Sequence, residues 1–65
     1  MDTGWLEDFL ALAELRNFSR AAQLRNITQP AFGRHIRALE ESIGQKLVDR
    51  SSSPVTLTPA GYQFR

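Results

Sequence analysis

The chain has 65 residues, 42% of them hydrophobic, and a formal net charge of +1, which is typical of one small folded domain rather than a disordered tail. No apolar run approaches the roughly 18 residues that a membrane span needs, and the N-terminus lacks the basic-then-apolar pattern of a secretory signal. The absence of cysteine excludes a disulfide framework and a zinc finger. We therefore expect a soluble cytoplasmic protein.

Periodic apolar residues predict a first helix over residues 3–15. The expected buried face consists of four residues at helical spacing, Leu6, Phe9, Leu10 and Ala13. Trp5 and Leu12 widen this face, and Trp5 is read as a core or interface residue rather than a ligand-binding one. A short second helix fits residues 19–24, with Ser19 as its N-cap and two small alanines that allow a close helix crossing.

A turn at residues 25–27 leads to the third predicted helix, from residue 28 or 29 to 43. Thr28 is a good N-cap, and Gly44 is well placed to end the helix in a left-handed conformation. The core stripe recurs at spacings of 4, 3 and 4 as Phe32, Ile36, Leu39 and Ile43. The opposite side carries Pro30, Gly33, Arg34 and Arg37. A helix with this division can be anchored from behind and laid into a DNA major groove.

Positive charge is concentrated around this helix. Residues 15–39 contain no acid and five arginines, namely Arg16, Arg20, Arg25, Arg34 and Arg37. Such a segment is either an electrostatic footprint for a polyanion or a solvated arginine face. Arg37 has a second option, because Glu41 lies one helical turn further on and can pair with it.

Two short strands are expected after residue 44, over residues 46–50 and 55–57, with a turn at residues 51–54. They form a hairpin of the kind that makes a winged helix. Thr58 and Pro59 are typical of a new helix start, and about eight residues of this last helix are present. We expect it to continue in a longer protein.

No group of residues predicts catalysis, so we expect no enzymatic activity. His35, the only histidine, lies at the edge of the core stripe and is interpreted as a partly exposed polar residue rather than a metal ligand. Glu40 is expected to orient a neighbour such as Arg50.

The order and spacing of several segments resemble the N-terminal DNA-binding domain of the LysR-type transcriptional regulators. The matching segments are FLALAE, NFSRAAQL, NITQPAFGRHIRALE, IGQKLVDR and VTLTPAG. The resemblance implies a mainly α, winged helix-turn-helix fold: three helices, a short two-stranded wing and the start of a linker helix. Residues 1–58 would form the DNA-binding domain, and residues 59–65 would begin the dimerisation helix.

The resemblance also implies a function and a set of site residues. The helix at 28–43 would enter the major groove of a roughly palindromic operator, and the full-length protein would be a homodimer or tetramer. No cofactor is expected in this domain, whereas a small-molecule inducer is expected for the missing effector domain. The candidate DNA-binding residues are Arg20, Thr28, Gln29, Pro30, Gly33, Arg34, Arg37, Arg50 and Ser53.

These residues suit different contacts. Gln29 can pair with adenine in two places, and Arg34 suits either guanine or a phosphate. Arg20 and Arg37 are better suited to phosphates, which position the protein without specifying sequence. Thr28 can offer a hydroxyl near the DNA backbone.

Three positions depart from the family pattern. Gly33 stands where serine is usual, which removes a hydroxyl and either permits closer approach or reflects drift. Ser53 stands where an arginine is common, which shifts the expected wing contact to Arg50. Val48 replaces a usual phenylalanine, so we expect looser packing of the hairpin.

The alternative function is a winged-helix domain used for protein–protein interaction, supported only by Gly33 and the uncharged wing. The 65-residue chain is expected to be a monomer or a weak dimer with poor DNA affinity.

Overall fold

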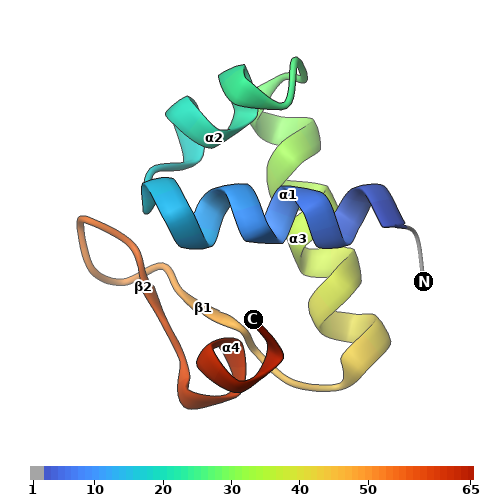
Figure 1. Ribbon diagram of the computed structural model, residues 1–65, viewed down its shortest axis with the longest axis vertical. Helices are drawn as coiled ribbons and strands as arrows, with labels where there is room; N and C mark the ends of the chain where they lie inside the picture. The colour runs from blue at the N-terminus through green and yellow to red at the C-terminus, as the bar shows by residue number, and fades with distance from the viewer. Residues whose placement is uncertain (1–2) are drawn as a thin grey trace.

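The computed structural model describes residues 3–65 as a mainly helical domain with a two-stranded antiparallel sheet (Figure 1). The elements in chain order are α1 (Thr3–Leu15), α2 (Phe18–Leu24), α3 (Gln29–Ile43), β1 (Val48–Asp49), β2 (Thr56–Leu57) and α4 (Pro59–Phe64). This order confirms the predicted winged helix-turn-helix fold.

The helices α1, α2 and α3 pack against one another. In Figure 1, α1 crosses α3, and α2 lies across the N-terminal end of α3. Their shared core is completed by residues from the hairpin, and its fully buried large side chains are Phe9, Leu12, Phe32, Ile36, Leu39 and Leu47. Ala21 and Ala22 are also buried, so the small side chains do face the helix crossing.

The ends of α3 are the ones that the sequence predicts. Thr28 is the N-cap, and its Oγ1 accepts a hydrogen bond from Ala31 N at 3.3 Å. Gly44 has a φ of 82°, the left-handed region that glycine enters without steric cost, and its N–H donates to Glu40 O at 2.8 Å. Both predicted caps are confirmed, and they fix where the exposed face of α3 begins and ends.

The predicted start of α2 is wrong by one residue. The helix begins at Phe18, and its N-cap is Asn17, whose Oδ1 accepts from Arg20 N at 2.9 Å. Ser19 therefore lies inside the first turn instead of capping it. An N-cap must have extended backbone, and Asn17 has it, with φ −148° and ψ 116°.

The buried face of α1 also differs from the prediction. Phe9 and Ala13 are buried as expected, but Leu10 is 42% exposed. Because α2 and α3 both pack against the side centred on Phe9 and Leu12, Leu10 turns toward solvent. Asp8 takes a place in the interior instead and is only 2% exposed.

The hairpin is present but shorter than predicted. Its register pairs Val48 with Leu57 and Asp49 with Thr56, and the buried Val48 and Leu57 share the inner face. Thr58 N then donates to Leu47 O at 3.0 Å, and Thr58 Oγ1 caps α4 by accepting from Gly61 N at 3.1 Å. The backbone at the buried Leu47 thus ties Thr58, and with it the start of α4, to the core.

Candidate nucleic-acid interface

The front of α3 is exposed along its length. Gln29, Pro30, Arg34 and Arg37 are exposed and Gly33 is partly exposed, while the core stripe behind them is buried. The structure thus places the predicted reading residues together on one open face. A Cβ on Gly33 would meet no heavy atom within 4 Å outside the backbone of its own helix, so this part of the face is unobstructed.

A groove runs beside this face toward the wing. We call it the Gly33 groove, and its lining residues are Phe18, Gln29, Pro30, Gly33, Arg50 and Val55. It joins the start of α2, the N-terminal half of α3 and the two ends of the wing loop. A second hollow continues it toward the wing tip, where Gln29 and Ser53 share a lining.

Arg50 lies across the Gly33 groove, in the turn that follows β1. Its guanidinium carbon stands 4.9 Å from the centre of the Phe18 ring, and its Nη2 donates a long hydrogen bond of 3.5 Å to Gly33 O. The side chain is exposed. The structure therefore brings Arg50 next to α3, and its role as the charged wing contact stays a prediction.

The remaining predicted residues lie around this groove. Thr28 is exposed, but its hydroxyl already caps α3, so only its second lone pair and its proton are open to another partner. Ser53 is exposed in the wing loop, and Arg20 is exposed on α2. The structure brings neither Arg20 nor Arg34 into the grooves described above.

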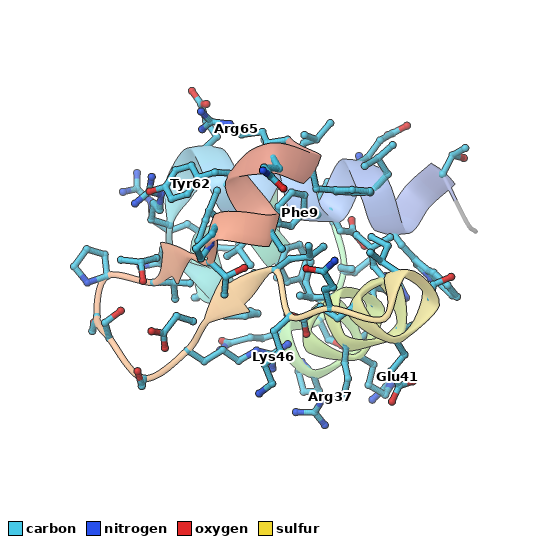
Figure 2. The ribbon with its side chains drawn as sticks, turned by 90° about the horizontal axis from the view of Figure 1, so that it is seen from below. Phe9, Arg37, Glu41, Lys46, Tyr62 and Arg65 are labelled. Carbon is cyan, nitrogen blue, oxygen red and sulfur yellow. The ribbon has the colours of Figure 1, made fainter. Side chains whose placement is uncertain are left out.

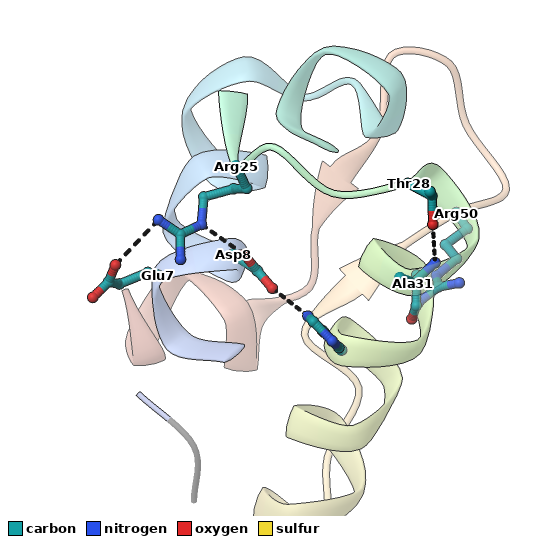
Figure 3. Close-up of polar contacts among 8 residues, drawn as sticks. Glu7, Asp8, Arg25, Thr28, Ala31 and Arg50 are labelled. Atoms are coloured by element: carbon teal, nitrogen blue, oxygen red, sulfur yellow. Dashed lines mark hydrogen bonds and ion pairs between the residues drawn. The ribbon is translucent and has the colours of Figure 1, made fainter. Parts of the chain in front are cut away.

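The basic segment is less open than its sequence indicates. Arg25 is bound to two carboxylates of α1, through Nη1 to Glu7 at 3.1 Å and through Nε to Asp8 at 2.7 Å (Figure 3). Arg16 donates to Ala13 O and to the Tyr62 hydroxyl. Of the five arginines, Arg20, Arg34 and Arg37 keep exposed side chains without an ion pair among residues 3–65.

Asp8 is the centre of a polar network that the sequence analysis missed. Its Oδ2 lies 2.7 Å from His35 Nδ1, so one buried carboxylate links α1 both to α3 and to the turn before it. The hydrogen bond with Asp8 is the main cause that raises the pKa of Arg25, and burial opposes it. His35 is partly exposed as predicted. The network fixes the angle at which α3 is presented.

Glu40 was predicted to orient Arg50, but its carboxylate binds backbone N–H groups instead. Its Oε2 accepts from Leu47 N at 2.8 Å and from Val48 N at 3.2 Å. The carboxylate of Glu40 thus satisfies two backbone N–H groups at the point where the chain enters β1.

Arg37 and Glu41 share the same side of α3 (Figure 2), but the described part of the chain contains no ion pair between them. The competing pairing is therefore absent. Lys46, which the sequence analysis did not select, points to the same side as Arg37 in Figure 2 and lines a groove with it.

Two residues with structural roles, Asp8 and Phe18, were not among the predicted site residues. Asp8 lies between Trp5, Phe9 and Leu12 on the apolar side of α1, and an acid at such a position indicates a buried polar contact. Phe18 directly follows the N-cap of α2, and the sequence prediction assigned it no role. Its contact with Arg50 joins residues 32 positions apart, which local sequence does not predict.

Within residues 3–65, no helix is long and apolar enough to cross a membrane. The same residues contain no cluster of three or more histidine, cysteine or acidic side chains suited to a metal ion.

Comparison with known proteins identifies the family. Residues 3–62 match the family model described as bacterial regulatory helix-turn-helix protein, lysR family. The HTH-type transcriptional regulator YjiE of Escherichia coli is 52% identical over 64 residues, which cover 98% of this chain and 21% of that protein. The chain thus spans about a fifth of the length of such relatives.

Solved structures agree with the sequence match. Vibrio fischeri DarR in complex with DNA superimposes with a TM-score of 0.99 at 60% identity, covering the whole of this chain and 22% of DarR. The BenM_DBD complex with catB site 1 DNA gives 0.94 at 41% identity, covering 98% of this chain and 72% of that one. None of these matches supports the protein-interaction alternative. The chain belongs to the lysR family of bacterial regulatory helix-turn-helix proteins and matches the DNA-binding domains of its members.

Proposed function

We propose that this domain binds double-stranded DNA sequence-specifically, with the N-terminal half of α3 in the major groove. The observation that carries the proposal is the exposed front of α3, which presents an amide, small residues and arginines while its back is buried in the core. The similarity to DarR and BenM_DBD, both described in complex with DNA, supports it. An α-helix fits the width of the major groove, where base edges can be distinguished.

The site residues divide by the chemistry of their side chains. Gln29 and Arg34 are proposed to read base edges, since an amide suits adenine and a guanidinium suits guanine. Pro30 and Gly33 would form a surface between Gln29 and Arg34 that the DNA approaches closely. Thr28 would lie near the DNA backbone. Three cations on separate elements, Arg20, Arg37 and Arg50, are proposed to bind phosphates. Ser53 would approach the flanking groove without charge.

Salt titration of DNA binding tests this proposal. Three phosphate contacts per copy predict that log affinity falls with log salt at a slope near −3. The probe is a 30-base-pair duplex that the chain selects from a randomised library, compared with a scrambled duplex of the same composition. Failure to prefer the selected duplex at any salt concentration would exclude sequence-specific binding.

Two substitutions separate reading from positioning. Gln29→Ala should reduce the preference for the selected duplex, because it removes a base contact. Arg20→Ala should weaken binding to both duplexes alike and reduce the salt slope by about one. Equal effects of the two substitutions on the selected-to-scrambled ratio would contradict the assigned roles.

For the full-length regulator, we propose residues 1–58 as the DNA-binding domain and α4 as the beginning of the linker helix. Two copies would then bind the half-sites of a roughly palindromic operator in the bacterial cytoplasm. The part of the relatives that this chain does not span is proposed to hold a small-molecule inducer. A longer chain should dimerise where the 65-residue chain does not, which sedimentation measures directly.

A further inference from the structure

Arg50 is held in place by two elements that are distant in sequence. Its guanidinium stacks at 4.9 Å on the ring of Phe18, in the first turn of α2, and its Nη2 reaches Gly33 O on α3 at 3.5 Å. Arg50 therefore lines the wing side of the Gly33 groove. An exposed arginine otherwise samples many rotamers, so this arrangement selects a small set of them.

The ring that carries Arg50 is itself fixed by the core. Phe18 meets Phe32 edge to face, with ring centres 5.8 Å apart and an interplanar angle of 87°. Phe32 is fully buried, whereas Phe18 is partly buried. One face of the Phe18 ring is thus available to the guanidinium, and a continuous line of contacts runs from Phe32 in the core through Phe18 to Arg50.

Among residues 3–65, no acidic side chain forms an ion pair with Arg50. The ion pairs among residues 3–65 join Arg25 and His35 to acids of α1, and the neighbouring Asp49 carboxylate accepts from Ser51 N and Oγ. One long hydrogen bond to Gly33 O occupies one of the five N–H donors of Arg50. The others remain for a ligand at the edge of the Gly33 groove.

We propose that Phe18 is a positioning residue for Arg50, and that it holds the guanidinium ready to bind a backbone phosphate of the DNA beside the recognition helix. The proposal rests on the DNA-binding function proposed above. A phosphate is the expected ligand because Arg50 stands on the wing side of α3, at the rim of the groove, and not on the front face with Arg34.

The physical basis is preorganisation. Ordering a long side chain at an interface costs free energy, and a side chain already held in its binding conformation avoids most of that cost. Stacking on an aromatic ring also leaves the edge of the guanidinium, with its donors, free for the phosphate. The gain is independent of DNA sequence, since the ligand is a phosphate.

A double-mutant cycle tests the coupling. Phe18→Leu keeps an apolar side chain against Phe32 but removes the ring face, and we expect it to weaken binding to selected and scrambled duplexes alike by about two- to fivefold. Arg50→Gln should weaken binding further and reduce the salt slope by about one. In the Arg50→Gln background, Phe18→Leu should have little additional effect.

Two further variants separate positioning from general packing. Phe18→Tyr restores the ring and should recover the affinity of the parent chain. Phe64→Leu is the matched control, because Phe64 meets Phe9 edge to face at the same 5.8 Å but carries no arginine. Its effect on binding should be the same in the parent and Arg50→Gln backgrounds. Circular dichroism verifies that every variant is folded at the temperature of measurement.

A second measurement needs no DNA. Ring currents from Phe18 should shift the Arg50 Hδ resonances upfield in the parent chain and in Phe18→Tyr, and this shift should be lost in Phe18→Leu. Unchanged Arg50 resonances in Phe18→Leu, or an undiminished Phe18→Leu effect in the Arg50→Gln background, would overturn the positioning role. A parent chain that shifts Arg50 but binds no duplex would instead overturn the DNA-binding function and, with it, the phosphate contact.

Discussion

Charged side chains behind α3 are bonded within the fold, whereas those in front of it are exposed. Behind the helix, Asp8 and Glu40 each accept two contacts from neighbouring elements, and the carboxylates are used to fix the fold. In front, Arg34 and Arg37 are exposed and form no ion pair within residues 3–65. The difference teaches that total charge along the chain is a poor guide to binding. The informative quantity is the charge that remains after internal pairing.

The largest expected effect comes from the close approach of α4 to the segment that enters β1. A Cβ on Gly61 would clash with the backbone oxygen of Leu47, so Gly61→Ala forces α4 away from the chain entering β1. We expect a loss of about 2–3 kcal/mol in the free energy of unfolding, because overpacking outweighs the roughly 1 kcal/mol gain in helix propensity. Chemical denaturation measures this loss, and a neutral substitution would show that α4 is not held closely.

The next effect concerns the Asp8 network. Asp8→Ala leaves Arg25 and His35 without their shared acceptor, and we expect a loss of about 1–3 kcal/mol because both partners retain some access to water. Glu7→Ala is the matched control. It also removes a partner of Arg25, but the Glu7 side chain is 60% exposed, so its loss should cost less than about 1 kcal/mol. Equal losses would mean that burial of Asp8 is unimportant.

A substitution on the front face should have the opposite sign. Gly33→Ala places a methyl group in open space and should raise the free energy of unfolding by about 0.5–1 kcal/mol, because alanine favours the helix. Where the DNA approaches closely at this position, the added methyl group should leave the DNA affinity of the Gly33→Ala variant level or lower it. A simultaneous gain in stability and affinity would show that Gly33 reflects drift and has no role in the contact.

The smallest effect is a titration in the wing. The Ser51 hydroxyl, and then the Ser51 N–H, hold the pKa of Asp49 below its usual 3.8 by hydrogen bonding to the ionised form. The stabilisation of the folded state by these hydrogen bonds is therefore complete above pH 3.8. It is lost as the pH falls through the lower pKa that Asp49 has in the folded chain. Carboxyl NMR measures the midpoint, and Ser51→Ala should move it upward, toward the usual value. An unchanged midpoint in that variant would contradict the assigned cause.

The sequence alone located the helices and the front of α3, although it misplaced the cap of α2 and the exposed Leu10 of α1. Caps at Thr28 and Gly44 and the stripe from Phe32 to Ile43 depend on contacts within about four residues, which spacing reveals. The wing was located correctly but not its length, since strand pairing depends on the partner segment. The cap of α2 is Asn17 rather than the predicted Ser19, because Asn17 has the extended backbone typical of an N-cap.

Only the tertiary structure decided which polar groups are available. Asp8 removes Arg25 from the basic segment, Glu40 binds backbone instead of Arg50, and Phe18 meets Arg50 across the groove. These contacts join residues that are 7 to 32 positions apart, and their existence depends on how whole elements pack. Local periodicity therefore determined the shape of the reading helix, whereas packing determined which charges remain free to act with it.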